Sequence, residues 1–189
     1  MKKGNGEIAG LNDTNFPPWE RGCRQGGLVN FTVMNQNLLD FKKIMDKHQV
    51  RFVVIFGTLL GFIREKGVII TSKDVDVFGY ASDHYKMKPV VKELQELNFH
   101  VLDRNESPLK DHHIIRGGEK IEIWWFEKMI TNKKEEWVYD DRIRYDGKFF
   151  NTLETVNVLG VEWKVPSNPE ENLVITYGED WKIPNSNKS

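Results

Sequence analysis

The feature that most constrains the fold is a short apolar run that ends in a Gly-Thr pair. Phe52 to Phe56 (FVVIF) is apolar and rich in β-branched residues, which predicts a buried strand. Gly57-Thr58 ends this strand, and Leu59 to Arg64 (LLGFIR) predicts a short helix. A turn between a strand and a helix presents free backbone amides, and these amides together with the helix dipole favour a bound phosphate. An ordinary turn glycine is the simpler interpretation of Gly57.

The other patterns along the chain predict helices packed on a mixed sheet. Apolar residues at helical spacing predict a helix from Leu28 to about His48, Pro89 marks the start of another, and a last one should run from Pro169 to Gly178, capped by Asn168. Strand-like runs lie at Val68 to Ile70, Val75 to Phe78, Phe99 to Leu102, His112 to Ile115 and Ile121 to Phe126. Because the last three are close enough in sequence to form a meander, we expect an α/β (α+β) fold whose mixed sheet is flanked by helices. Lys133 to Glu136 (KKEE) is expected to be a solvated loop.

The composition indicates a globular chain with one core. Its 189 residues, 39% of them hydrophobic, can form one substantial core, so we expect a single domain over residues 28–189 after an N-terminal arm over residues 1–27. A formal net charge of −1 gives no overall basic field, and we expect no nucleic-acid partner. The single cysteine, Cys23, excludes an internal disulfide, and we see neither a signal peptide nor a transmembrane segment. A cytoplasmic location is therefore expected.

Two acids stand one residue apart within a run that otherwise looks like a strand. In the stretch TSKDVDVF, Asp74 and Asp76 alternate with Val75 and Val77, so the two carboxylates share one face while the valines point into the core. Like charges this close repel each other and raise one pKa unless a cation lies between them. Mg²⁺ is the natural candidate because it prefers hard oxygen ligands. A solvated strand edge is the alternative explanation for such a pair.

A third acid follows in a later predicted strand. Glu122 is flanked by isoleucines in KIEIW and projects from the opposite face to theirs, with Trp124 on its own face. A lone glutamate there would more often be exposed, but together with the two aspartates it becomes a candidate third ligand or general base. Core packing is the simpler interpretation of Trp124, and stacking on a ring is the alternative. Of the neighbouring His112 and His113, only one can face the same site.

These motifs occur in an order that resembles the nucleotidyltransferase superfamily typified by DNA polymerase beta, and implies its fold. Residues 57–69 (GTLLGFIREKGVI) are more closely similar to the GTLLGxxRxxGxI signature of the LicD and fukutin family of phosphotransferases, and the D-x-D follows at the expected distance. The family's closing pattern is matched by Val165-Pro166, Leu173, Tyr177-Gly178, Trp181 and Pro184. The resemblance covers roughly Asn30 to Pro184, which is most of the chain.

The resemblance implies a metal-dependent transferase. Such an enzyme would move a phosphorylated alcohol, of the phosphocholine or polyol-phosphate type, from a CDP-activated donor to a sugar hydroxyl of a glycan or lipid-linked acceptor. Asp74, Asp76 and Glu122 would hold Mg²⁺ or Mn²⁺, and Glu122 would complete the site or take the acceptor proton. All three would then be both catalytic and metal-binding residues.

The resemblance also implies four residues that bind the substrate. Gly57 and Thr58 would contact the donor phosphates, and Arg64 matches the family arginine, whose fork of donors suits phosphate. A solvated charge or an ion pair with Glu65 explains Arg64 equally well. Lys66 is a weaker candidate on the same logic.

One stretch departs from the family pattern. Members often have Pro-Trp-Asp-Asp-Asp where this chain has ITSKD at residues 70–74, so two acids and an aromatic ring are missing and phosphocholine cannot be assumed as the donor group. Two alternatives stay open. One is a nucleotidyltransferase that moves AMP or CMP from a nucleoside triphosphate to a small molecule or a protein. The other is a catalytically inactive relative that binds a nucleotide or a glycan.

Overall fold

The computed structural model describes residues 27–104 and 111–184. In chain order the elements are α1 (Phe31–Lys47), β1 (Phe52–Val54), α2 (Phe56–Arg64), β2 (Val75–Tyr80), the 3₁₀ helix η1 (Ala81–Lys86), α3 (Met87–Glu96), β3 (His100–Arg104), β4 (Asp111–Arg116), β5 (Glu119–Thr131), β6 (Lys134–Tyr139), β7 (Ile143–Asp146), the 3₁₀ helix η2 (Gly147–Phe149), β8 (Leu153–Val158), β9 (Val161–Pro166) and α4 (Pro169–Tyr177). The predicted arm, with Cys23, lies outside the described residues apart from Gly27, so the domain boundary at residue 28 stays a prediction.

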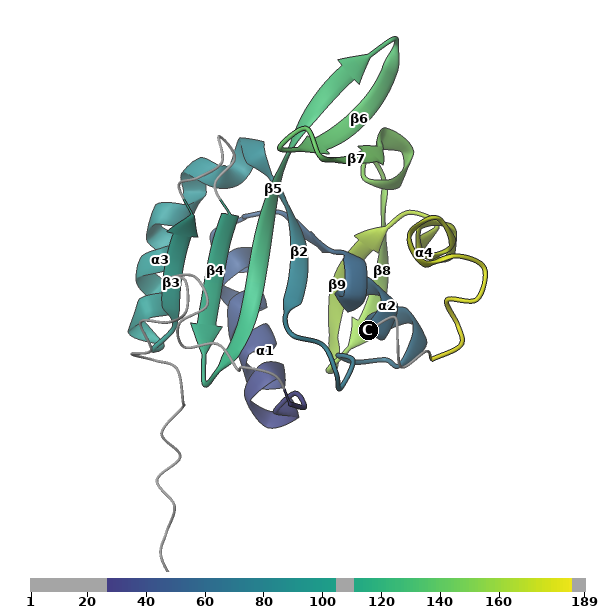
Figure 1. The fold of residues 1–189 in the computed structure, drawn as a ribbon. Coiled ribbons are helices and arrows are strands. Elements are labelled where there is room, and N and C mark those ends of the chain that lie inside the picture. The colour runs from purple at the N-terminus through teal and green to yellow at the C-terminus, as the bar shows by residue number, and fades with distance from the viewer. Residues whose placement is uncertain (1–26, 105–110, 185–189) are drawn as a thin grey trace, which may run out of the picture.

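The described residues build a seven-stranded sheet in which β1, β2, β5, β4 and β3 lie side by side in that order, and β6 and β7 continue from β5. The pair of β2 and β5 is parallel and the other pairs are antiparallel, so the sheet is mixed, as predicted. β3, β4 and β5 form the predicted meander. Helices α1 and α3 cover one face of this sheet, and the end of β5 runs on with β6 beyond it (Figure 1).

Helix α1 follows the predicted periodicity. It begins after Asn30, whose side-chain oxygen accepts a hydrogen bond from the backbone N–H of Val33 at 3.3 Å. The stripe that contains Met34, Leu38 and Phe41 is fully buried against the sheet. Phe31 lies in the first turn and is 40% exposed, so it does not belong to this stripe.

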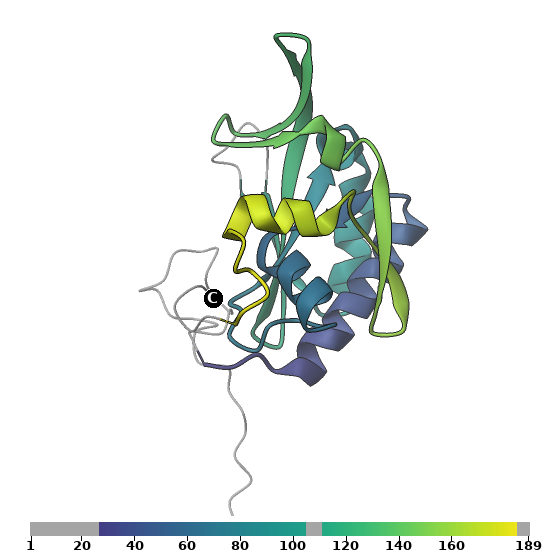
Figure 2. The ribbon, with the colours of Figure 1, turned by 90° about the vertical axis from the view of Figure 1, so that its right-hand side faces the viewer.

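A second, two-stranded sheet packs on the edge strand β1. Strands β8 and β9 form a hairpin in which the ring of the buried Trp163 lies 6.1 Å from the ring of Phe52 in β1 and 5.3 Å from that of Phe62 in α2. The hairpin leads into α4, which lies next to α2 (Figure 2). This packing places α4 beside α2, whose first turn is bonded to β2.

Several local predictions are wrong. Val68 to Ile70 is irregular and not a strand, and Phe56 begins α2 so that Gly57-Thr58 lies in the first helical turn. Lys134 to Glu136 belongs to strand β6, because the hairpin turn is limited to Asn132 and Lys133. Asn168 stands at the cap position of α4, but it has a left-handed φ of 49° and its side chain makes no capping hydrogen bond.

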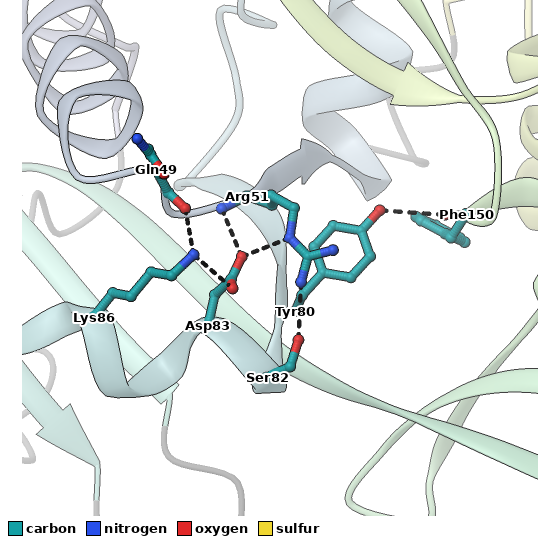
Figure 3. A network of polar contacts seen from close by, with 7 residues as sticks. All are labelled: Gln49, Arg51, Tyr80, Ser82, Asp83, Lys86 and Phe150. Atoms are coloured by element: carbon teal, nitrogen blue, oxygen red, sulfur yellow. Dashed lines mark hydrogen bonds and ion pairs between the residues drawn. The ribbon is translucent and has the colours of Figure 1, made fainter.

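A polar network ties the start of β1 to the end of β2 (Figure 3). The Asp83 carboxylate accepts hydrogen bonds from the backbone N–H and Nε of Arg51 at 3.1 and 2.7 Å, and Lys86 Nζ lies 2.9 Å from its other oxygen. Lys86 also donates to the carbonyl oxygen of Gln49 at 2.7 Å. Burial raises the pKa of Asp83, but the hydrogen bonds from Arg51 and Lys86 outweigh burial and bring the pKa below its ordinary value. The network therefore holds β1 against β2, the strand that carries Asp76.

Among the described residues, no helix combines the length and the apolar character needed to cross a bilayer.

Candidate active site

Three acids from two neighbouring strands meet at the start of β2. Asp76 lies on β2 directly opposite Glu122 on β5, because these strands run parallel in that register, and Asp74 immediately precedes β2. One carboxylate oxygen from each of the three acids lies within 4.8 Å of the other two. The structure therefore brings together the three acids that the sequence predicted from separate stretches, at a spacing that suits a shared divalent cation.

Protein donors surround this triad of Asp74, Asp76 and Glu122. Trp124 donates its indole N–H to Asp76 Oδ1 at 3.0 Å. Lys120 Nζ lies 3.1 Å from Asp74 Oδ2 and also contacts Glu122 Oε1. The sequence pattern did not indicate Lys120 as a site residue. The signal that could have found it is its place two residues before Glu122, which puts both side chains on one face of β5.

One histidine of the predicted pair reaches the triad. His113 Nε2 lies 3.1 Å from Glu122 Oε1, and the side chain of His113 is 3% exposed. His112 faces the other side of β4, where its Nδ1 accepts a hydrogen bond from the indole N–H of Trp125 at 3.0 Å. This arrangement agrees with the expectation that neighbouring histidines on a strand face opposite ways.

The charges of the triad are not balanced. Burial raises the pKa of Asp76 to about 8, and the nearby charges of Asp74 and Glu122 add to this rise. Burial alone would lower the pKa of Lys120, but the charges of Glu122 and Asp74 outweigh it and raise the pKa above its ordinary value. Lys120 is therefore an ammonium among three carboxyl groups, and a further cation would stabilise the ionised form of Asp76.

The first turn of α2 is bonded directly to the strand that carries Asp76. The backbone N–H of Asp76 donates to the hydroxyl of Thr58 at 2.8 Å, and the backbone N–H of Ile55 donates to the carbonyl oxygen of Asp76 at 3.2 Å. Thr58 is buried, and this bond makes it a link between α2 and β2. Ile55 stands at the N-cap position of α2 and makes no side-chain capping bond, so within the part of the chain that the structure describes this helix start suits an anion beside the triad.

Arg64 and Lys66 lie at the opposite end of α2. The Arg64 guanidinium pairs with Glu65 at 2.6 Å and donates to the carbonyl oxygen of Trp181 at 3.1 Å. Lys66 Nζ donates to the carbonyl oxygen of Ile63 at 3.1 Å. The structure therefore does not bring these two cations to the acids. Arg64 instead forms the ion pair with Glu65 that was the alternative interpretation of its sequence position.

The triad opens into a pocket of about 510 Å³. This volume lies in the range of small-molecule sites. Its lining includes the triad, Gly57 and the exposed Lys73, together with a largely apolar wall of Phe56, Leu60, Ile69, Trp124, Ile143 and Tyr177. Thr58, Arg64 and Lys66 are not among the described residues that line it. Phe56 gave no sequence signal for this role because it was assigned to the preceding strand, and no element was predicted around Ile143.

Gly61 allows the wall of the pocket to approach α2. A Cβ at this position would lie 2.5 Å from the carbonyl oxygen of Gly67, so only glycine lets the loop after α2 pack this closely. The same loop continues through Ile69 and Ser72 to Asp74. Gly61 of the GTLLGxxRxxG stretch therefore helps to position the acids.

Comparisons with known proteins agree with this architecture. A family model for the nucleotidyltransferase domain of LicD, FKTN and FKRP matches residues 49–168. The fold is similar to the lincosamide antibiotic adenylyltransferase LnuA in its lincomycin-bound crystal structure, with a TM-score of 0.51 and 11% identity over 76% of this chain and 85% of that one. It is also similar to the antibiotic-resistance factor ANT(2'')-Ia, with a TM-score of 0.51 and 12% identity over 72% of this chain and 66% of that one. No curated protein matches the chain in sequence. The family match covers more than half of the chain, and the chain therefore belongs to the LicD/FKTN/FKRP family of transferases with a nucleotidyltransferase fold.

Proposed function

We propose that this transferase moves a phosphorylated alcohol from a CDP-activated donor to a sugar hydroxyl of a glycan or lipid-linked acceptor. The observation that carries the proposal is the meeting of Asp74, Asp76 and Glu122 within 4.8 Å, in a pocket beside the uncapped start of α2. Membership of the family supports the same reaction class. A solvated strand edge would not place three acids from two strands around one pocket.

The donor set suits a hard divalent cation. Asp74 and Asp76 offer carboxylate oxygens from partly buried positions and Glu122 from a buried one, and we propose that they hold Mg²⁺ or Mn²⁺. When bound, the ion would neutralise the donor diphosphate and stabilise the departing nucleotide. Trp124 holds Asp76 in place through its indole N–H, and the bond between Asp76 and Thr58 fixes the strand below it.

The other residues of the pocket have distinct proposed roles. The backbone at Gly57 would bind donor phosphate at the start of α2, and Lys73 would add positive charge at the pocket rim. The aromatic wall, which contains Phe56, Trp124 and Tyr177, suits a base or sugar ring. Thr58 would act through the backbone of Asp76. Arg64 would reach donor phosphate only after its bonds to Glu65 and Trp181 break.

The reaction forms one bond and breaks one bond at phosphorus. The acceptor hydroxyl oxygen bonds to the phosphorus atom that carries the alcohol, the bond from that phosphorus to the bridging oxygen breaks, and CMP leaves with the bridging oxygen. Glu122 would accept the proton of the acceptor hydroxyl. Its Oε1 also contacts Lys120 and His113, and these two contacts orient the carboxylate.

A second candidate is transfer of a nucleotidyl group from a nucleoside triphosphate to a small molecule. The adenylyltransferase LnuA, which has a similar fold, was solved with lincomycin bound, and the replacement of two family acids at residues 70–73 weakens the case for a phosphocholine donor. The two reactions release different products. CMP indicates alcohol-phosphate transfer, whereas pyrophosphate indicates nucleotidyl transfer.

A product screen tests both candidates. Purified protein with Mg²⁺ is incubated with CDP-choline, CDP-ribitol, CDP-glycerol and the nucleoside triphosphates, each with an oligosaccharide library, and the released nucleotide is identified by mass spectrometry. We expect acceptor-dependent release of CMP from one CDP-alcohol and no release by Asp76→Asn. Release of pyrophosphate would favour the second candidate. If no donor is consumed, or if the variant matches the wild type, the chain is an inactive relative and the proposal is wrong.

A further inference from the structure

The side chain of Lys120 lies among the acids of the triad. Lys120 lies on β5 with 14% of its side chain exposed, and its ammonium contacts Asp74 Oδ2 at 3.1 Å and Glu122 Oε1. The ammonium therefore bridges two of the three acids of the triad. The bridge joins both strands that supply the acids, because Asp74 precedes β2 and Glu122 belongs to β5.

Protein donors engage one oxygen of each acid in the triad. Lys120 contacts Asp74 Oδ2 and Glu122 Oε1, and Trp124 donates to Asp76 Oδ1. Within residues 27–104 and 111–184, the other oxygen of each acid takes part in no hydrogen bond or ion pair. This leaves one oxygen per acid, and one oxygen from each of three acids is a suitable set for a single ion that completes its shell with water and phosphate.

A second divalent ion would have to share an oxygen with the ammonium. The second ion and the Lys120 ammonium would then both lie between Asp74 and Glu122. Two cations a few ångströms apart in a partly buried site repel each other strongly. The three acids supply at most three negative charges, of which Lys120 balances one. The remaining charge matches one divalent ion.

We propose that Lys120 is a built-in cation that takes the place of a second metal ion, so that the triad binds one divalent ion per chain. This inference rests on the proposed function, because it assumes that the triad is a metal site. Lys120 is a positioning residue in this account. Its fixed charge orients Asp74 and Glu122 in the absence of metal and remains beside the ion when the site is filled.

The stoichiometry of Mn²⁺ binding tests the proposal without substrate or turnover. Free Mn²⁺ is measured by electron paramagnetic resonance during titration of wild type, Lys120→Met, Lys120→Arg and Lys73→Met, and Asp76→Asn identifies ions bound elsewhere on the surface. Lys73→Met is the matched control because it removes an exposed lysine from the same pocket, for which no contact with the triad is found among the described residues. Thermal melting in EDTA confirms that each variant is folded.

We expect wild type, Lys120→Arg and Lys73→Met to bind one ion at the triad, and Lys120→Met to bind two. The two ions of Lys120→Met should broaden each other's spectrum because they lie close together. Two ions in wild type, or one ion in Lys120→Met, would overturn the inference and leave the metal-dependent function intact. The number of ions bound by wild type tests the inference even if Lys120→Met does not fold. If Mn²⁺ binds to none of the proteins, both the inference and the metal centre are wrong.

Discussion

Replacing Asp76 with asparagine should stabilise the metal-free protein while it removes the metal site. Burial and the charges of Asp74 and Glu122 raise the pKa of Asp76 to about 8 in the folded protein. In the unfolded chain an aspartate has a pKa of about 3.9. Because the folded pKa is the higher one, ionised Asp76 lowers the free energy of unfolding at pH values above about 4, and the loss grows until the pH reaches the folded value.

The size of the effect follows from the gap between the two pKa values. At pH 7 the loss is about 4 kcal/mol as an upper limit, since each pH unit above the unfolded pKa contributes about 1.4 kcal/mol. Asparagine removes this charge and keeps an oxygen that can accept the indole N–H of Trp124. We therefore expect Asp76→Asn to raise the free energy of unfolding by roughly 2–4 kcal/mol, or the melting temperature by roughly 5–10 °C.

Urea unfolding in EDTA at pH 5 and pH 7.5 measures this difference. The gain should be larger at pH 7.5 than at pH 5, because the pH 5 sample keeps Asp76 protonated in the folded state. Asp74→Asn is the control, because it should lower the free energy of unfolding where Asp76→Asn raises it. This substitution removes the carboxylate that lies 3.1 Å from Lys120 Nζ. A variant that is less stable than wild type at pH 7.5, or a gain that does not depend on pH, would refute the reasoning.

Three further predictions concern catalysis and packing. Glu122→Gln should lower kcat by about a hundredfold or more if Glu122 is the base, and an unchanged initial rate would remove that role. Gly61→Ala should lower the free energy of unfolding by about 1–3 kcal/mol because of the contact with the Gly67 carbonyl, whereas Gly57→Ala, whose Cβ meets no atom within 4 Å, should melt like wild type. Asp83→Asn should cost about 1–3 kcal/mol at pH 7. Its pKa is lowered on folding, so this cost should shrink as the pH falls towards 3, and a constant cost would contradict the ionic role.

The arrangement of the acids was predictable because it follows from strand geometry. Side chains alternate between the two faces of a strand, so Asp74 and Asp76 share one face. In the same way Glu122, which stands between two isoleucines, projects from the face opposite to theirs on its own strand. The sequence could not show that β2 and β5 are neighbours and parallel. That pairing depends on long-range packing, and it sets Asp76 opposite Glu122.

The missed hairpins lack the usual sequence signals. β6 begins with Lys134, Glu135 and Glu136, and it needs no regular apolar alternation because its paired ribbon with β5 extends beyond the main sheet (Figure 1). The turn between β8 and β9 has positive φ at Leu159 and Gly160, where an Asn-Gly pair would have been the clear indication. Lys120 was missed for another reason. A lysine two residues from a glutamate on a strand is common on solvated surfaces, so its burial between two acids emerges only from the fold.

The most direct test of the metal centre is a crystal structure of the wild-type protein grown with Mn²⁺ and recorded at a wavelength where manganese scatters anomalously. The account predicts one anomalous peak, with Asp74, Asp76 and Glu122 each contributing an oxygen at about the distance expected for a hard divalent ion, roughly 2.0–2.2 Å. A peak bound by other residues, or no peak at the triad at saturating Mn²⁺, would contradict it.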